Sequence, residues 1–475
     1  MRALLVSAPK SVLGFDRFVR LPNLGLTSIA ANTDKELCEV KVLDLHVVNK
    51  NRPKFLRKVI ELYKPDIVGF SAMIFQYQVS VEMAKMVRQH YPDLCLILGG
   101  YYATIDYEKI IHSEEGKLFD FIIYGEGERP FNELIKALSN GHDFSQVPNL
   151  VYRENGEVKI NPRGELLTLA ELKPPDRSSR WVKKGFHFFG IPADEIETSR
   201  GCIFDCNFCS IREMYGKTFR KYSIERVVED LRDAREHGAK SVFFIDDNIT
   251  QDGKRYKKLC EEIIRNGLND LKHIVQVNVK GLRNTPGLIP AMAKSGCIAV
   301  VIGIENVLDE NLSGMQKSNQ FKSHEVEEVV RELKRNKIMT IGSFILGLPD
   351  DTKESLYANF DYAKKIGLDM PLLNILTPHP KTEMREKLLE MGLITNPDDY
   401  SKYDLFGANI RTKYLSPEEI EEIRHKLDRR YPLESGNAFR LVRKYPWFIM
   451  KLVWQKVTSE PIDMLRYFKS LFGIK

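Results

Sequence analysis

The sequence of 475 residues predicts an α/β protein in three parts: a doubly wound parallel sheet, a partial (βα)6 barrel and a helical carboxyl-terminal region. Two observations support this prediction. Short apolar runs alternate with segments of helical periodicity in two long stretches, and such alternation is typical of parallel sheets. A segment rich in proline and serine separates the two stretches. We therefore expect parts at residues 1–145, 146–190 (a connector), 191–400 and 401–475.

Five apolar runs in residues 1–145 predict the strands of a Rossmann-like sheet: ALLVSAP, VKVLDL, DIVGFSA, LCLILGG and DFIIYGE. Ligands of such sheets bind beyond the carboxyl ends of the strands. Small residues occupy three of these ends and would let a flat, bulky ligand approach the backbone. They are Ser71, Gly99, Gly100, Gly125 and Gly127, with Glu126 between the last two. Ordinary turn chemistry is the alternative for each glycine taken singly.

The connector, residues 146–190, contains two recognisable pieces. VPNLVYRENGEVKINPR predicts a β-hairpin with its turn at Asn155-Gly156. LKPPDRSSRW predicts a linker, because proline and serine interrupt regular structure.

Strand–helix alternation resumes at about residue 192 and gives six βα units. The strands are ADEIETS, SVFFIDD, HIVQVNV, AVVIGIE, MTIGSFILG and DMPLLNIL, and the helices span 223–237, 254–266, 286–295, 323–336, 352–366 and 381–391. Six units make a partial barrel rather than a closed one of eight.

Polar residues lie on or after several barrel strands, where a barrel core is normally apolar, so they suggest a lined cavity. They are Asp246, Asp247, Asn248, Gln276, Asn278, Glu305, Asn306, Ser343 and Asn374. Some have an alternative role as helix caps, notably Asp247, Asn306 and Asp351.

The net charge of +6 is concentrated in residues 440–475, which hold eight Lys or Arg and two acids. With the main body neutral, nucleic-acid binding is not expected. Aromatic and aliphatic residues accompany these charges, so the tail either lies on an anionic membrane or packs on the other domains. We find no signal peptide or apolar spanning segment, and expect a cytoplasmic protein with peripheral contact at the inner face of the membrane through 440–475.

The run SRGCIFDCNFCS places Cys202, Cys206 and Cys209 at the spacing C-x3-C-x2-C, directly after the first barrel strand. A closed zinc site needs four ligands, and no fourth follows nearby. Three thiolates on a four-iron cluster would leave one iron open to a non-protein ligand. A zinc site completed by His187 or Cys260 is the alternative. Seven cysteines with three clustered also indicate a reducing compartment.

With this spacing the sequence resembles the radical S-adenosylmethionine (SAM) superfamily, within the group that includes class B methyltransferases and Mg-protoporphyrin monomethyl ester cyclase. PNLGLTSIAA, VGFSA, LGGYYAT and IIYGEGE resemble the cobalamin-binding domain that precedes many such barrels. The resemblance implies a [4Fe-4S] cluster on Cys202, Cys206 and Cys209, and SAM beside Phe208, Asp247, Gly303, Glu305 and Ser343. It implies cobalamin beside Ser71, Gly99, Gly100, Gly125, Glu126 and Gly127.

The sequence departs from the family at two places. Asp44-Leu45-His46 lacks the glycine of the D-x-H-x-x-G motif, so we expect no protein histidine on cobalt. The final barrel strand is followed by Pro378-His379-Pro380-Lys381-Thr382 where relatives often have P-x-P-G-T. His379 is either a proton acceptor or a surface-loop histidine.

The resemblance implies a radical SAM enzyme. From its two cofactor domains and the aromatic, basic tail, we expect it to methylate an unactivated carbon or form a C–C bond on a hydrophobic small molecule, such as a lipid or isoprenoid. Its reductant would be a flavodoxin or ferredoxin. The alternatives are a radical SAM cyclase or rearrangement enzyme in which cobalamin is redox-active or absent, and a non-enzymatic cobalamin or iron–sulfur sensor.

Overall fold

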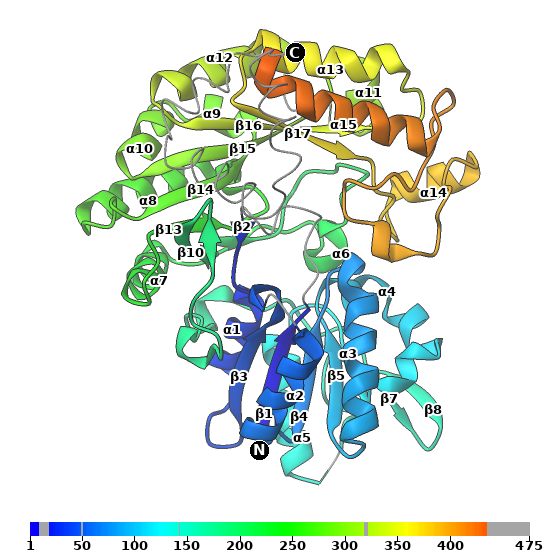
Figure 1. Cartoon of the computed structure of the whole chain (residues 1–475). Helices are drawn as coiled ribbons and strands as arrows, with labels where there is room; N and C mark the ends of the chain where they lie inside the picture. Colours follow the sequence, from blue (N-terminus) through cyan, green and yellow to red (C-terminus); the bar gives the residue numbers. More distant parts are fainter. Residues whose placement is uncertain (9–18, 49–50, 142, 318–321, 435–475) are drawn as a thin grey trace.

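Two parallel sheets dominate the computed structural model, which describes residues 1–8, 19–48, 51–141, 143–317 and 322–434. In Figure 1 the first sheet and its helices lie below, and the second sheet curls above them. The predicted α/β class is confirmed. Residues 440–475, the basic segment for which we predicted membrane contact, lie outside the described residues. No helix in the described part of the chain is long and apolar enough to cross a membrane.

The first sheet has seven strands in the order β3-β1-β4-β5-β6-β7-β8. Their bounds are β1 (Arg2–Ser7), β3 (Glu39–Asp44), β4 (Ile67–Ser71), β5 (Cys95–Gly99), β6 (Phe121–Ile123), β7 (Leu150–Glu154) and β8 (Glu157–Ile160). The first five are parallel, as their uninterrupted apolar runs predict. The chain reverses its winding direction between β1 and β4, and ligands of doubly wound sheets bind at such a reversal.

Helices cover both faces of the first sheet: α1 (Leu24–Asn32), α2 (Arg52–Tyr63), α3 (Tyr77–His90), α4 (Tyr101–His112) and α5 (Glu128–Ser139). α1 and α5 share one apolar core with the sheet, and α2, α3 and α4 share the other. Asn23 caps α1 by accepting a hydrogen bond from the Leu26 N–H at 3.0 Å. Glycines after β5 and before α5 keep the carboxyl edge of the sheet open.

The predicted hairpin is confirmed as β7 and β8, which extend the first sheet antiparallel to β6. Its turn has positive φ at both central residues, 51° at Asn155 and 82° at Gly156. Such a two-residue turn matches the twist of paired strands, and asparagine and glycine tolerate it best.

The second sheet is the predicted partial barrel, with six parallel strands in the order β17-β16-β15-β14-β13-β10. Their bounds are β10 (Ile191–Ile196), β13 (Ser241–Phe244), β14 (Lys272–Val277), β15 (Cys297–Glu305), β16 (Met339–Leu346) and β17 (Met370–Ile375). Beyond β10 the sheet continues through β9 (His187–Phe188) to β2 (Val19–Arg20), both antiparallel. β2 precedes α1 in the chain, so the amino-terminal region contributes the last strand of the second sheet.

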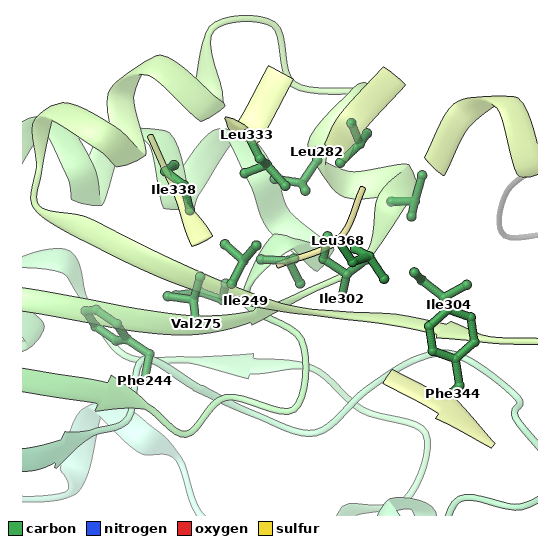
Figure 2. Close-up of a cluster of buried hydrophobic side chains, with 14 of the residues drawn as sticks. Phe244, Ile249, Val275, Leu282, Ile302, Ile304, Leu333, Ile338, Phe344 and Leu368 are labelled. Atoms are coloured by element: carbon green, nitrogen blue, oxygen red, sulfur yellow. The ribbon is translucent and has the colours of Figure 1, made fainter. Parts of the chain in front are cut away.

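The helices of the second part lie on the outer side of the curled sheet (Figure 1). They are α7 (Ile224–Glu236), α8 (Gly253–Arg265), α9 (Val279–Arg283), α10 (Leu288–Lys294), α11 (Asp309–Gly314), α12 (Ser323–Arg335), α13 (Lys353–Lys365), α14 (Glu383–Glu390) and α15 (Pro417–Glu434), while α6 (Ile211–Tyr215) sits between the two parts. Figure 2 shows the apolar core that holds helices to strands, including Val275, Ile302 and Leu333. All six predicted barrel helices are present.

The predicted linker LKPPDRSSRW is not a free linker, because Arg177 within it is fully buried. Its guanidinium forms ion pairs with Asp194 at 3.1 Å, Asp230 at 2.6 Å and Asp233 at 2.8 Å. The sequence analysis did not predict these ion pairs, because an arginine among prolines and serines has no local pattern that reveals distant partners. These carboxylates stand on β10 and α7, so the segment is fastened to the barrel.

Arg177→Met is expected to lower the free energy of unfolding by about 3–5 kcal/mol, because it leaves buried carboxylates without a counter-charge. Chemical denaturation of the apoprotein measures this. Arg235→Met on the outer side of α7 is the matched control, since Arg235 is 34% exposed and pairs with Asp270. The control should change stability by less than about 1 kcal/mol. Equal effects of the two changes would contradict the assignment.

Candidate active site between the two domains

The cysteine loop leaves the barrel after β10 and passes through β11 (Ser199–Arg200), which pairs with β12 (Arg220–Lys221). Residues 201–206 contain no helix or strand. Both ends of the loop are fixed by hydrogen bonds. The Gly201 N–H donates to Asp247 at 3.1 Å, and the Asn207 backbone carbonyl accepts from the Met384 N–H at 3.1 Å. The loop is thereby held over the carboxyl ends of the barrel strands.

Cys202, Cys206 and Cys209 form no disulfide bond, and each is partly exposed. Burial raises the pKa of Cys202 to about 11 and that of Cys209 to about 12, so both carry protons until a metal displaces them. Among the described residues, no three His, Cys, Asp or Glu side chains converge as ligands of one metal ion. A four-iron cluster is larger than one ion and holds its thiolates farther apart. Three thiols from a single loop could hold three irons of a four-iron cluster and leave the fourth iron open to another ligand.

A chain of polar side chains runs across the carboxyl ends of β15, β16 and β17. Glu305 pairs with Lys317 at 2.5 Å, and its other oxygen accepts from Ser343 at 3.5 Å. Asn374 donates to Ser343 at 3.0 Å. Lys317 also donates to the Gly303 carbonyl at 3.3 Å. Three of the five predicted SAM residues thus lie together, and Lys317, which the sequence analysis missed, joins them.

The backbone conformation explains why the Glu305 side chain points toward these polar side chains. The pairing of β15 with β16 shifts register between Gly303 and Glu305, and Glu305 has a φ of 64°. Such an irregularity re-aims a side chain at the end of a strand. A Cβ on Gly303 would lie 2.7 Å from the Glu305 carboxylate and 3.0 Å from the Lys317 amine, so glycine keeps the ion pair possible.

Of the other two predicted SAM residues, Asp247 bonds to the start of the cysteine loop and Phe208 lies within the loop, next to Cys209. Asp247 does not cap a helix, since Asn248 occupies the residue before the following helical turn. Asp247 instead accepts the Gly201 hydrogen bond, and burial raises its pKa to about 7. Phe208 packs partly buried against the barrel core. Beyond the effect of burial, Asp247 raises the pKa of the Cys202 thiol and Lys317 lowers it, so both polar groups act electrostatically on that thiol.

A cavity of about 220 Å³ opens at the carboxyl ends of β4, β5 and β6 and extends between the sheet and α1. All six residues that we predicted to contact cobalamin line it: Ser71, Gly99, Gly100, Gly125, Glu126 and Gly127. Its inner wall is apolar, with Leu26 and Ile29 of α1 facing Ile97 of β5. Ligand pockets typically measure roughly 300–1,000 Å³, so this cavity has room for only part of a corrinoid. His46 is not among the lining residues, and its ring lies 6.0 Å from that of Phe186.

Glycine is required at two points of this cavity. Gly100 has a φ of 91°, and a Cβ there would lie 2.7 Å from the Ser71 hydroxyl and 2.9 Å from the Ala72 nitrogen. Gly125 has a φ of 77°, and a Cβ would lie 2.6 Å from the Asn149 amide. This open, glycine-lined wall fits the tail of a cobalamin.

The same cavity is walled on its other side by the barrel. Glu197, Arg200, Met214 and Tyr215 line it, and all four flank the cysteine loop in sequence. The predicted cobalamin site and the predicted cluster site therefore share a wall, which the sequence analysis did not foresee.

Tyr101 makes a second bridge between the domains. It is the first residue of α4, and its hydroxyl hydrogen-bonds with that of Ser210, next to Cys209. Its ring stands edge-on to that of His379 with centroids 6.2 Å apart. His379 is half-buried rather than a surface-loop residue, and its Nδ1 is enclosed without a hydrogen-bond partner. Burial lowers the pKa of His379 to about 4, so the imidazole is neutral near pH 7.

Glu195 bonds to Leu24, which lines the cavity, and its titration provides a test by pH. It accepts a hydrogen bond from Leu24 at the start of α1, and burial raises its pKa from 4.5 to about 8. Because the folded state binds this proton more tightly, the contribution to stability is complete below pH 4.5 and is lost as pH rises to about 8. Between these two pH values, the melting temperature of Glu195→Gln should change less with pH than that of the wild type. Parallel profiles would contradict the assignment.

Known protein families and relatives match both parts of this chain. The Radical SAM superfamily profile matches residues 196–363, and the B12 binding domain profile matches residues 11–135. The uncharacterized methyltransferase PH0819 of Pyrococcus horikoshii is 29% identical over 95% of this chain and 96% of its own. The hopanoid C-3 methylase of Methylococcus capsulatus is 28% identical over 86% of this chain and 76% of its own.

A solved structure shares the fold. The radical S-adenosylmethionine methyltransferase TsrM from Kitasatospora setae, with cobalamin and a [4Fe-4S] cluster bound, superposes with a TM-score of 0.70 at 20% identity. The match covers 90% of this chain and 87% of that one. The fold and the two matched domains define an enzyme class that uses an iron–sulfur cluster, SAM and cobalamin together. This chain is a radical SAM enzyme with a B12-binding domain.

Proposed function

We propose that the enzyme transfers a methyl group to an unactivated carbon of a hydrophobic small molecule. The observation that carries the proposal is the shared wall: the glycine-lined cavity of the first domain is also lined by residues that lie just before and just after the cysteine loop in the chain. A methyl carrier and a radical source can act on one carbon only if they are adjacent. When bound, the cluster and SAM supply a radical, and cobalamin supplies a transferable methyl group.

The residues divide the work as follows. Cys202, Cys206 and Cys209 hold the cluster. Gly303, Glu305, Ser343, Phe208 and Asp247 bind SAM. The amine of Lys317, which is held in place by its ion pair with Glu305 at 2.5 Å, adds a positive charge beside an anionic cofactor group. Ser71, Gly99, Gly100, Gly125, Glu126 and Gly127 surround the cobalamin tail.

The neutral His379 and Tyr101 stand where both domains meet the cysteine loop, and we assign to them the boundary of the substrate space. An enclosed imidazole nitrogen without a partner is unfavourable, so a substrate that offers a hydrogen-bonding group there gains affinity. His379→Phe should raise the KM for substrate at least fivefold while SAM cleavage without substrate stays at the wild-type rate. An unchanged KM would remove His379 from the substrate boundary.

Two findings support a lipid or isoprenoid as the substrate. A relative of 28% identity is named a hopanoid C-3 methylase. The aromatic and basic segment 440–475 has the composition of a membrane-surface helix. We expect a flavodoxin or ferredoxin as the electron donor, since one-electron reduction of the cluster must precede radical formation.

The test is an anaerobic assay of the enzyme reconstituted with iron, sulfide and hydroxocobalamin, with SAM labelled in its methyl group. Label should pass from SAM into a lipid extract of the source cells and not into the polar extract. Label in the polar extract alone would overturn the substrate class. Formation of 5′-deoxyadenosine without label in either extract would overturn methyl transfer and favour ring formation or rearrangement.

A further inference from the structure

Arg200 lies where the two predicted cofactor sites meet. It ends β11 and stands two residues before Cys202, and its side chain is only 7% exposed. It also lines the cavity of the first domain. One buried side chain thus belongs to the cysteine loop by sequence and to the cobalamin cavity by position.

The guanidinium of Arg200 contacts three carboxylates from both domains. It pairs with Glu126 at 2.7 Å and with Glu128 at 2.7 Å, and its Nε donates to Glu197 at 2.9 Å. Glu126 lies in the loop after β6 and Glu128 is the first residue of α5, whereas Glu197 follows β10 of the barrel. A planar guanidinium with fixed donor directions can satisfy this set in a single orientation.

The two carboxylates of the first domain are themselves held in place. Arg220 of β12 also binds Glu126, at 2.9 Å, and Ser28 of α1 donates to Glu128 at 2.8 Å. Although burial opposes ionisation, the Arg200 guanidinium holds the pKa of Glu128 below its ordinary value. The loop that carries three of the predicted cobalamin contacts is thus tied directly to the residue before Gly201.

We propose that Arg200 is a positioning residue that couples cobalamin binding to cluster binding. The inference rests on the proposed function, since it assumes that both cofactors bind. Residues 201–206 form no regular structure, so their conformation is set by their end points and by what they ligate. A cluster on this loop fixes the backbone at Cys202, and through Arg200 it fixes the loop at Gly127. Cobalamin then meets a wall that is already ordered and binds more tightly.

Thermodynamic linkage makes the proposal quantitative. If the cluster tightens cobalamin binding by some factor, cobalamin must tighten cluster binding by the same factor. Typical couplings are about 5–150-fold. A side chain that only stabilises the fold would change both affinities without creating such a matched pair of factors.

The experiment measures the Kd of hydroxocobalamin, by its absorbance change, for protein with and without the reconstituted cluster. It also measures the equilibrium partition of cluster iron to a chelator with and without cobalamin. In the wild type we expect both factors to be at least about fivefold and equal. In Arg200→Lys, which keeps the charge but cannot span three carboxylates, we expect both cofactors to bind and both factors to fall to about one.

Arg180→Lys is the matched control. Arg180 is buried to the same degree, with 6% side-chain exposure, and binds Asp194 through two bonds of 2.7 and 2.8 Å, but it touches neither cofactor loop. In Arg180→Lys, each cofactor should tighten binding of the other by the same factor as in the wild type. Glu128→Gln retains the shape of the side chain and removes one ionic partner of Arg200, so it should reduce both coupling factors. It replaces Arg200→Lys as the test if that variant does not fold.

Specific outcomes overturn the proposal. A wild-type factor of one in either direction, or a factor retained in both Arg200→Lys and Glu128→Gln, would show that the arginine does not couple the sites. Failure of the wild type to bind cobalamin or a cluster at all would instead refute the proposed function, and the coupling with it.

Discussion

The variant with Cys202, Cys206 and Cys209 all replaced by alanine is expected to purify without iron and to cleave no SAM. None of the three cysteines of the loop forms a disulfide bond, and none belongs to the apolar core. The variant should therefore fold, while about four irons per chain are lost together with their visible absorbance. Iron analysis, the absorbance spectrum and 5′-deoxyadenosine formation measure the effect.

Cys95→Ala is the control for this variant. Cys95 is a free cysteine of similar partial exposure, at the start of β5 and far from the carboxyl edge of its sheet. It should retain full iron content. Iron retained by the triple variant, or SAM cleavage by it, would place the cluster elsewhere in the chain.

Gly99→Leu is expected to weaken cobalamin binding by at least about tenfold, which corresponds to about 1.4 kcal/mol, without unfolding the protein. Gly99 lines the cavity, and a Cβ there meets only the Ile123 carbonyl, at 3.7 Å. Gly99 also lacks the positive φ of Gly100, so a side chain adds no backbone strain. A leucine can therefore be accommodated by the fold, and it fills space that the cobalamin tail would occupy.

The measurement is a hydroxocobalamin titration, combined with thermal unfolding of the apoprotein. Gly156→Ala in the hairpin turn is the control, since no atom lies within 4 Å of its Cβ and it is remote from the cavity. The φ of 82° at Gly156 strains an alanine there, so the thermal unfolding measurement also establishes that the control is folded. It should bind cobalamin like the wild type. A Gly99→Leu variant of unchanged affinity would show that cobalamin does not enter this cavity.

The main strands were predictable because parallel strands are buried on both faces and leave uninterrupted apolar runs. DIVGFSA and LCLILGG, for example, became β4 and β5. β2, β9, β11 and β12 were not predictable, because two residues each are too few to show a period. The fold class therefore followed from the sequence, whereas the connection of the two sheets through β2 and β9 did not.

The sequence predicted the positions of the candidate site but not their connections. Local motifs identified the cysteines and the strand-end glycines. Lys317 carried no local signal, since a lysine after a short helix is usually solvated. The contacts of Arg200 were equally unpredictable, because its carboxylate partners Glu126 and Glu128 lie 74 and 72 residues away in the chain. Such contacts depend on how the domains dock, which no short-range pattern records.

The strand β2 limits how this protein can be divided. Val19 pairs with Phe188 and Arg20 with His187, so the chain enters the second sheet before it completes the first. A barrel expressed alone from residue 146 onward would end in the unprotected edge of β9, and an exposed edge invites aggregation. Chimeras that exchange amino-terminal domains between relatives should therefore carry residues 19–20 together with their partner strand. The two domains are modular in sequence but are not separable pieces of the polypeptide.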